Sequence, residues 1–145
     1  MKFHFLSSNN PEAKNTEKKL TELFGQNSVE DADYIIPIGG DGLLLKSLHN
    51  FNKLNKPFFG INFGSIGFLM NNLSNENLND MIINAKKSTF KPLKMTAQSV
   101  NNEIFEAYAY NEVSLMRQTH LASKIKIKIN EKVKMEELIC DGVLL

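Results

Sequence analysis

Residues 34–42 read Tyr-Ile-Ile-Pro-Ile-Gly-Gly-Asp-Gly, and a leucine-rich helical pattern follows at residues 43–48. The apolar, β-branched run predicts a buried strand, and the glycines predict a loop that leads into the helix. Such a loop can lie close to a ligand, and the N–H groups that start a helix favour phosphate. Asp41 is unusual there, because a carboxylate repels phosphate. We interpret it as a Mg²⁺ ligand or as the proton acceptor for a hydroxyl group that is phosphorylated; the alternative is a helix cap.

Strands and helices alternate on both sides of this loop, up to about residue 87. Strands are expected at residues 2–7, 34–38 and 57–62, and helices after Asn10-Pro11, after Gly42 and after a capping Ser74. The predicted buried faces of the first and third helices comprise Ala13, Leu20, Leu23, Phe24, Leu78, Met81, Ile82 and Ala85. Pro37 removes a backbone donor from the second strand, so we expect a bulge or an unpaired edge there. The alternation predicts an α/β fold, with a parallel-sheet nucleotide-binding domain at residues 1–87.

Residues 88–145 change to the pattern of antiparallel strands. Hairpins are expected at residues 93–110, around Asn101-Asn102, and at residues 124–138. Lysines alternate with isoleucines at residues 124–129, which predicts a solvated strand face rather than a phosphate track. The chain ends on an apolar strand at residues 143–145 with no polar tail. We therefore expect the first strands of a β-rich second domain that is truncated.

Composition narrows the class of protein. A formal net charge of +1 over 145 residues disfavours a nucleic-acid binder, which is usually strongly basic. Cys140 is the only cysteine, so the chain contains neither an intrachain disulfide nor a thiolate metal cluster. No apolar run reaches the length of a signal peptide or a membrane span. These features predict a cytoplasmic protein that binds neither nucleic acid nor membrane.

Three segments together resemble the bacterial-type NAD kinase family, in its N-terminal half. They are Gly39-Gly40-Asp41-Gly42, the segment Gly-Ile-Asn-Phe-Gly-Ser-Ile-Gly-Phe-Leu at residues 60–69, and Asn111-Glu112. The last five residues, Asp-Gly-Val-Leu-Leu, also resemble a family segment. The first loop alone is shared with diacylglycerol-type lipid kinases and with 6-phosphofructokinase. Leu43 departs from the family pattern, in which Thr or Asn is common after Gly-Asp-Gly.

The resemblance implies transfer of a phosphoryl group from ATP, with Mg²⁺ or another divalent cation, to the 2′-hydroxyl of the adenosine ribose of NAD. It assigns catalysis to Asp41. Its implied binding residues are Gly39, Gly40 and Gly42 for the phosphates, Phe68 and Leu69 for adenine, Asn111 and Glu112 for the adenosine ribose and base, and Asp141 for the nicotinamide-ribose side. It also implies a homo-oligomer, either a dimer or a tetramer.

Two alternatives remain open at this point. One is a diacylglycerol-type or sugar kinase that shares the Gly-Gly-Asp-Gly loop. The other is a non-catalytic fragment that binds NAD. Because the resemblance covers nearly the whole chain but only about half of a typical family member, we expect residues 1–145 alone to be inactive as a kinase.

Overall fold

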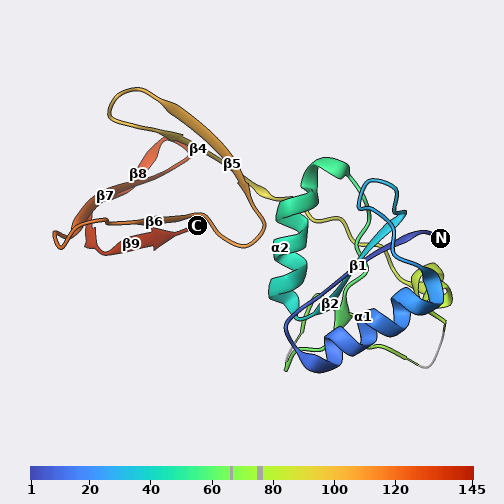
Figure 1. Ribbon diagram of the computed structural model, residues 1–145. Helices are drawn as coiled ribbons and strands as arrows, with labels where there is room; N and C mark the ends of the chain where they lie inside the picture. Colours follow the sequence, from blue (N-terminus) through green and yellow to red (C-terminus); the bar gives the residue numbers. More distant parts are fainter. Residues whose placement is uncertain (66, 75–76) are drawn as a thin grey trace. The chain divides into compact units, whose positions relative to one another are not determined.

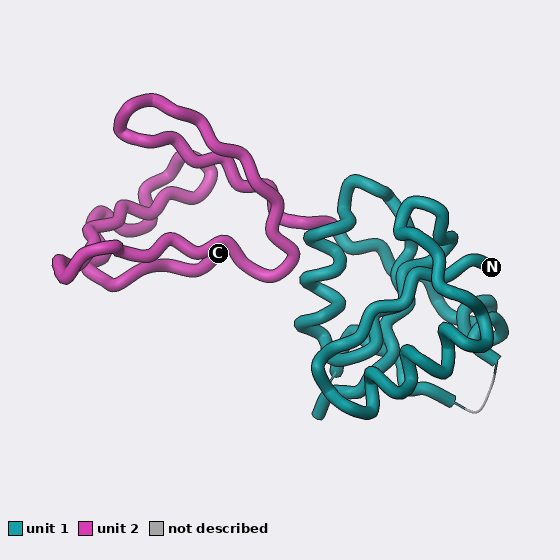
Figure 2. Tube along the Cα trace, viewed as in Figure 1, with its two compact units in different colours: residues 1–90 teal, residues 91–145 magenta. Residues whose placement is uncertain are grey.

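The computed structural model describes residues 1–65, 67–74 and 77–145. The chain divides into two units, Met1–Phe90 and Lys91–Leu145 (Figure 2). Each unit has its own strands, and all the helices described belong to the first unit (Figure 1).

A three-stranded parallel sheet forms the centre of the first unit. Its strands are β1 (Phe3–Ser7), β2 (Tyr34–Gly39) and β3 (Ile61–Asn62), in the order β1-β2-β3. Helix α1 (Pro11–Phe24) connects β1 to β2 and packs against both strands. Helix α2 (Asp41–Phe51), with the short 3-10 helix η1 (Asn52–Leu54), connects β2 to β3. This arrangement confirms the predicted α/β class with a parallel sheet.

Apolar side chains from the sheet and the helices form the core of this unit. They are Phe3, Phe5, Ala13, Leu20, Ile36, Ile38, Phe59, Ile61, Leu78 and Ile82. The rings of Phe3 and Phe24 meet edge to face with centroids 5.5 Å apart, so the end of α1 is fixed on the sheet. The core thereby holds the ends of the strands in place for the loops that follow them.

Helix α1 begins as predicted. The Asn10 side chain accepts a hydrogen bond from the N–H of Glu12 at 2.8 Å, and Pro11 is the first helical residue. Gly25 ends the helix with a φ of 77°. Leu23 was predicted wrongly as buried; its side chain is 75% exposed. At 100° per residue, Leu23 lies about 80° around the helix from Ala13, and so outside the buried stripe.

Strand β2 is central despite Pro37. Its register with β1 is unbroken, with Leu6 opposite Pro37. The expected bulge is therefore wrong, because pairing with β1 continues through Pro37, whereas Pro37 is unpaired on the side that faces β3. The N–H that proline lacks would face β3, because Ile35 donates to Pro57 on that side and every second residue of a strand faces the same neighbour.

The third strand is shorter than the predicted residues 57–62. Phe58 forms only an isolated bridge with Ile35, and regular pairing begins at Ile61, opposite Ile38. Pro37 lies between these two paired positions of β2. Since it has no N–H to donate, the ladder is interrupted there.

The third helix, α3 (Leu78–Asn84), starts later than predicted. Its cap is Asn77, whose side chain accepts from the N–H of Asn79 at 2.9 Å, and not Ser74. Leu78 and Ile82 are buried as expected. Ala85 is exposed and terminates the helix, so its predicted burial is wrong. Among the described residues, no helix has the length and apolar character needed to cross a lipid bilayer.

The second unit consists of antiparallel pairs. They are β4 (Leu93–Gln98) with β5 (Ile104–Ala109), β6 (Ser114–Met116) with β9 (Gly142–Leu144), and β7 (Ser123–Ile129) with β8 (Lys132–Cys140). The turns have left-handed residues, Asn102 in the first hairpin and Asn130 and Glu131 in the β7–β8 hairpin. Both predicted hairpins are confirmed, and the final apolar strand pairs with β6.

Charged pairs line the exposed faces of these hairpins. Lys124 pairs with Glu137 at 3.2 Å, and Lys126 pairs with Glu136 at 2.7 Å. These pairs confirm the solvated strand face. Across β4 and β5, a hydrogen bond and charge attraction to Lys94 hold the pKa of the Glu106 carboxyl below its usual range, and the same contact raises the pKa of Lys94.

Candidate functional site

Two glycine-containing loops meet where the parallel strands β2 and β3 end. The N–H of Phe63, just after β3, donates to the carbonyl oxygen of Gly39, at the end of β2, at 2.6 Å. Gly40 and Gly64 face each other directly beyond this bond, since a Cβ on Gly64 would lie 3.2 Å from the Cα of Gly40. The carboxyl ends of neighbouring parallel strands are the usual binding edge of an α/β sheet. The predicted phosphate loop therefore lies against the residue 60–69 segment.

Asp41 joins the two loops through its side chain. Its Oδ2 accepts a hydrogen bond from the N–H of Phe68 at 2.9 Å, and its Oδ1 accepts one from the N–H of Leu69 at 3.1 Å. Asp41 is the first residue of α2, whose cap is Gly40 without any side-chain cap bond. The helix-cap alternative is therefore wrong. A carboxylate has about four lone-pair positions, so each oxygen keeps one for a proton or a cation.

Two asparagines that were not predicted as site residues support these loops. Asn62 accepts a hydrogen bond from the N–H of Gly64 at 3.0 Å. Asn10, at the start of α1, donates from its side chain to the carbonyl oxygen of Phe63 at 3.1 Å. The sequence could have indicated Asn62, because it lies within the residue 60–69 segment that resembles the family. Nothing in the sequence indicates that Asn10, besides capping α1, also binds Phe63.

The Phe68 side chain is 89% exposed, whereas Leu69 is half-buried. A phenylalanine is usually part of a core, but the ring of Phe68 is free to contact a ligand. Ile66, in the same segment, lies outside the described residues.

Asn111 and Glu112 belong to the second unit, between β5 and β6. Both are exposed, and the Asn111 side chain donates to the Glu112 carboxylate. Asp141 lies at the opposite end of the β6–β9 ribbon, because Val113 pairs with Leu145 while Arg117 donates to the carbonyl oxygen of Asp141. Six predicted residues thus lie together in the first unit, and the other three lie at two places in the second.

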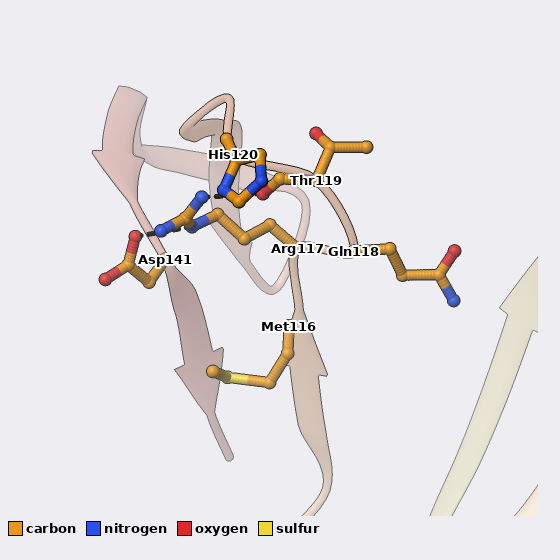
Figure 3. A pocket seen from close by; sticks show the side chains of 6 residues that line it. All are labelled: Met116, Arg117, Gln118, Thr119, His120 and Asp141. Carbon is orange, nitrogen blue, oxygen red and sulfur yellow. Dashed lines mark hydrogen bonds and ion pairs between the residues drawn. The ribbon is translucent and has the colours of Figure 1, made fainter.

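Arg117 holds Asp141, a contact that was not predicted. Its Nε donates to Oδ1 of Asp141 at 2.6 Å, and its Nη1 donates to the carbonyl oxygen of Thr119 at 2.6 Å. Figure 3 shows the guanidinium group directed at the carboxylate on the wall of an open pocket. The remaining lining residues are Met116, Gln118 and His120. The residues that flank Arg117 and Asp141 in the sequence do not indicate that these two side chains form an ion pair.

Comparisons with known proteins show the family of this chain. Residues 1–87 match the family model described as the ATP-NAD kinase N-terminal domain. The NAD kinase of Brucella suis biovar 1 is 45% identical over 141 residues, which are 97% of this chain and 55% of that protein. The NAD kinase of Rhizobium meliloti is 42% identical over 141 residues, with the same two shares.

A solved structure is also similar. It is an NAD kinase from Archaeoglobus fulgidus in complex with ATP, with a TM-score of 0.60 and 25% sequence identity, and the match covers 99% of this chain and 59% of that one. The chain spans about half the length of the curated relatives it matches. The family model covers more than half of the chain, and the resemblance seen in the sequence is confirmed. This chain belongs to the NAD kinase family.

Proposed function

We propose that this chain carries the phosphoryl-transfer residues of an NAD kinase, which phosphorylates the 2′-hydroxyl of the adenosine ribose of NAD to give NADP. One observation carries the proposal beyond family membership. The Asp41 carboxylate lies where the two glycine loops meet, and its free lone pairs suit a proton or a cation. The N-terminus of a helix favours a bound phosphate. A carboxylate beside it can accept the proton of a hydroxyl group that attacks that phosphate.

The reaction forms a bond between the 2′-oxygen of NAD and the γ-phosphorus of ATP. The bond from that phosphorus to the β–γ bridging oxygen breaks, and ADP leaves with the electron pair. The proton of the 2′-hydroxyl passes to the carboxylate of Asp41. A positioned proton acceptor contributes roughly 10²–10⁴-fold to the rate, and positioning and charge neutralisation supply most of the rest.

A divalent cation, when bound, would neutralise the charge of the phosphates. Within residues 1–65, 67–74 and 77–145, no three His, Cys, Asp or Glu side chains gather as a metal site. Mg²⁺ bound with a nucleotide commonly takes one or two carboxylates, phosphate oxygens and water. Asp41 fits that ligand set, because each of its oxygens keeps a free lone pair.

The binding roles proposed for the other residues follow their chemistry. The backbone at Gly39, Gly40 and Gly42 can approach phosphate. Phe68 and Leu69 offer an apolar surface for adenine. Asn111 and Glu112 combine an amide with a carboxylate, which suits the base and the ribose diol, and Asp141 is assigned to the nicotinamide-ribose side. We further propose a cytoplasmic homo-oligomer, a dimer or a tetramer.

A chimaera tests the function directly. The matching 141 residues of the Brucella suis NAD kinase are replaced by those of this chain, and NADP formation is followed with NAD, NADH or diacylglycerol as acceptor. We expect NADP formation near the rate of the parent enzyme, and a fall of roughly 10²–10⁴-fold in kcat for Asp41→Asn.

The alternatives give different results in the same assay. Phosphorylation of diacylglycerol by the chimaera would favour a lipid kinase. NAD binding without turnover would indicate a non-catalytic role. Near-normal turnover of the Asp41→Asn chimaera would exclude Asp41 as the proton acceptor.

A further inference from the structure

The hydrogen bonds of Asp41 suggest a role besides proton transfer. They connect the start of α2 to residues 27 and 28 positions later in the chain. Gly67 lies beside this contact: a Cβ there would be 3.4 Å from Oδ1 of Asp41, an ordinary contact distance, and 3.0 Å from Oδ1 of Asn62, which is tight. The carboxylate thus fits closely between the two loops.

Among the described residues, few contacts hold Phe68 itself. The residue is 89% exposed, so packing contributes little to its position. In that part of the chain, the backbone N–H groups of Phe68 and Leu69 both donate hydrogen bonds to the carboxylate of Asp41. On either side of these two residues, the Asn62 side chain accepts from the N–H of Gly64, and the backbone of Asn71 pairs with Gly60 and Asn62. Bonds to an ionised acceptor are about twice as strong as bonds between neutral groups, so we expect this carboxylate to contribute most to holding the backbone of Phe68 and Leu69 between those two anchors.

We infer that Asp41 is also a positioning residue, whose carboxylate couples the phosphate loop to the Phe68–Leu69 surface and thereby sets the affinity for the adenine end of NAD. The claim about adenine affinity rests on the proposed function, whereas the claim that Asp41 couples the two loops does not. A purely chemical role for Asp41 predicts that Asp41→Asn changes turnover and leaves NAD affinity within about tenfold. The positioning role predicts a loss of affinity as well, because an asparagine amide would present a donor to one of the two N–H donors.

Amide hydrogen exchange of the ¹⁵N-labelled 145-residue chain tests the coupling without substrate. We expect the N–H groups of Phe68 and Leu69 to exchange slowly in the unmodified chain, although Phe68 is exposed. In Asp41→Asn they should exchange at least about tenfold faster, while core amides such as Ile36 keep their rates. Unprotected Phe68 and Leu69 amides in the unmodified chain would overturn the inference.

The matched control is Asp80→Asn. Asp80 is an exposed carboxylate in the first turn of α3, as Asp41 is in the first turn of α2. This change removes the same charge from a helix N-terminus and leaves the loop contact intact. We expect it to leave the exchange of both loop amides unchanged. Faster exchange in Asp80→Asn would show a general effect of the lost charge and would contradict the positioning role.

Calorimetric measurement of NAD binding, without a phosphoryl donor, tests whether Asp41 sets the affinity for the adenine end of NAD. In the Brucella suis chimaera, we expect Asp41→Asn to weaken NAD binding by more than about tenfold and to raise KM as kcat falls, with Asp80→Asn unchanged. An unchanged NAD affinity would overturn the claim about adenine affinity. If the unmodified chimaera binds no NAD, the proposed function fails together with that claim, whereas protected loop amides would still establish the coupling.

Discussion

Exposed polar groups of the second unit already bind one another in the free chain. Asn111 donates to Glu112, and Arg117 pairs with Asp141, whose side chain is 72% exposed. Exposed pairs of this kind contribute about 0–1 kcal/mol to stability. Substrate hydroxyl groups can therefore replace them at little cost. The side chains of Asn111, Glu112 and Asp141 are therefore available for the substrate contacts that we propose.

Substitutions of the Asn111-Glu112 pair test its role in binding. We expect Asn111→Ala and Glu112→Gln to weaken NAD binding by roughly 1–3 kcal/mol each, because a ribose hydroxyl or its partner is left without a hydrogen bond. The measurement is calorimetric titration of the chimaera with NAD. Glu103→Gln, in the same unit, serves as the control and should bind normally. Unchanged affinity in both variants would exclude this pair as the ribose site.

At the scale of elements, the start of α1 has two structural functions. Asn10 caps the helix through the N–H of Glu12, and its amide also binds the carbonyl oxygen of Phe63 in the second loop. Asn77 caps α3 with the same geometry, accepting from Asn79 at 2.9 Å. One asparagine cap thus connects a helix to the candidate site, and the other stabilises its own helix.

The two caps allow a matched comparison. We expect Asn77→Ala to lower the free energy of unfolding by about 1 kcal/mol, the usual effect of losing an asparagine cap. Asn10→Ala should lower it by about 1 kcal/mol more, because the Phe63 carbonyl also loses its partner. Urea unfolding of the 145-residue chain measures both. Equal effects would mean that the Asn10–Phe63 bond adds nothing to stability.

At the scale of the molecule, the two units differ in how much apolar surface they bury. The buried core residues all belong to the first unit. In the second unit, the large apolar side chains left exposed include Ile104, Phe105, Leu115, Ile129, Val133, Ile139 and Leu144. Its sheets have two strands each, and such sheets are marginally stable without further packing. Exposed apolar strands with free edges recruit other chains.

We therefore expect residues 1–145 to have a folded first unit, to associate through the second unit, and to form no NADP at ordinary enzyme rates. The expected inactivity follows from the chain's spanning about half the length of its relatives. Size-exclusion chromatography and a coupled NADP assay on the purified chain test both statements. Lys94→Glu, which alters an exposed charge pair in this unit, controls for effects of charge on elution. A monodisperse monomer that makes NADP rapidly would refute both expectations.

Local patterns were sufficient to predict most of the elements. The Asn10-Pro11 start of α1, the glycine loop after β2 and the hairpin turn at Asn102 each depend on residues close together in the chain, so propensity and spacing predict them. The family resemblance likewise needed only short motifs, and it was confirmed. The roles of the candidate site residues stay predictions.

The contacts between distant segments required the folded chain. The sequence shows Asp41 in a glycine loop, but not that its carboxylate binds the N–H groups of Phe68 and Leu69. Arg117 and Asp141 are 24 residues apart in the sequence, which does not indicate that they form an ion pair. The third strand is short because Pro37 interrupts the ladder on that side. In each case the partner comes from another segment, and the pairing of strands decides which distant groups meet.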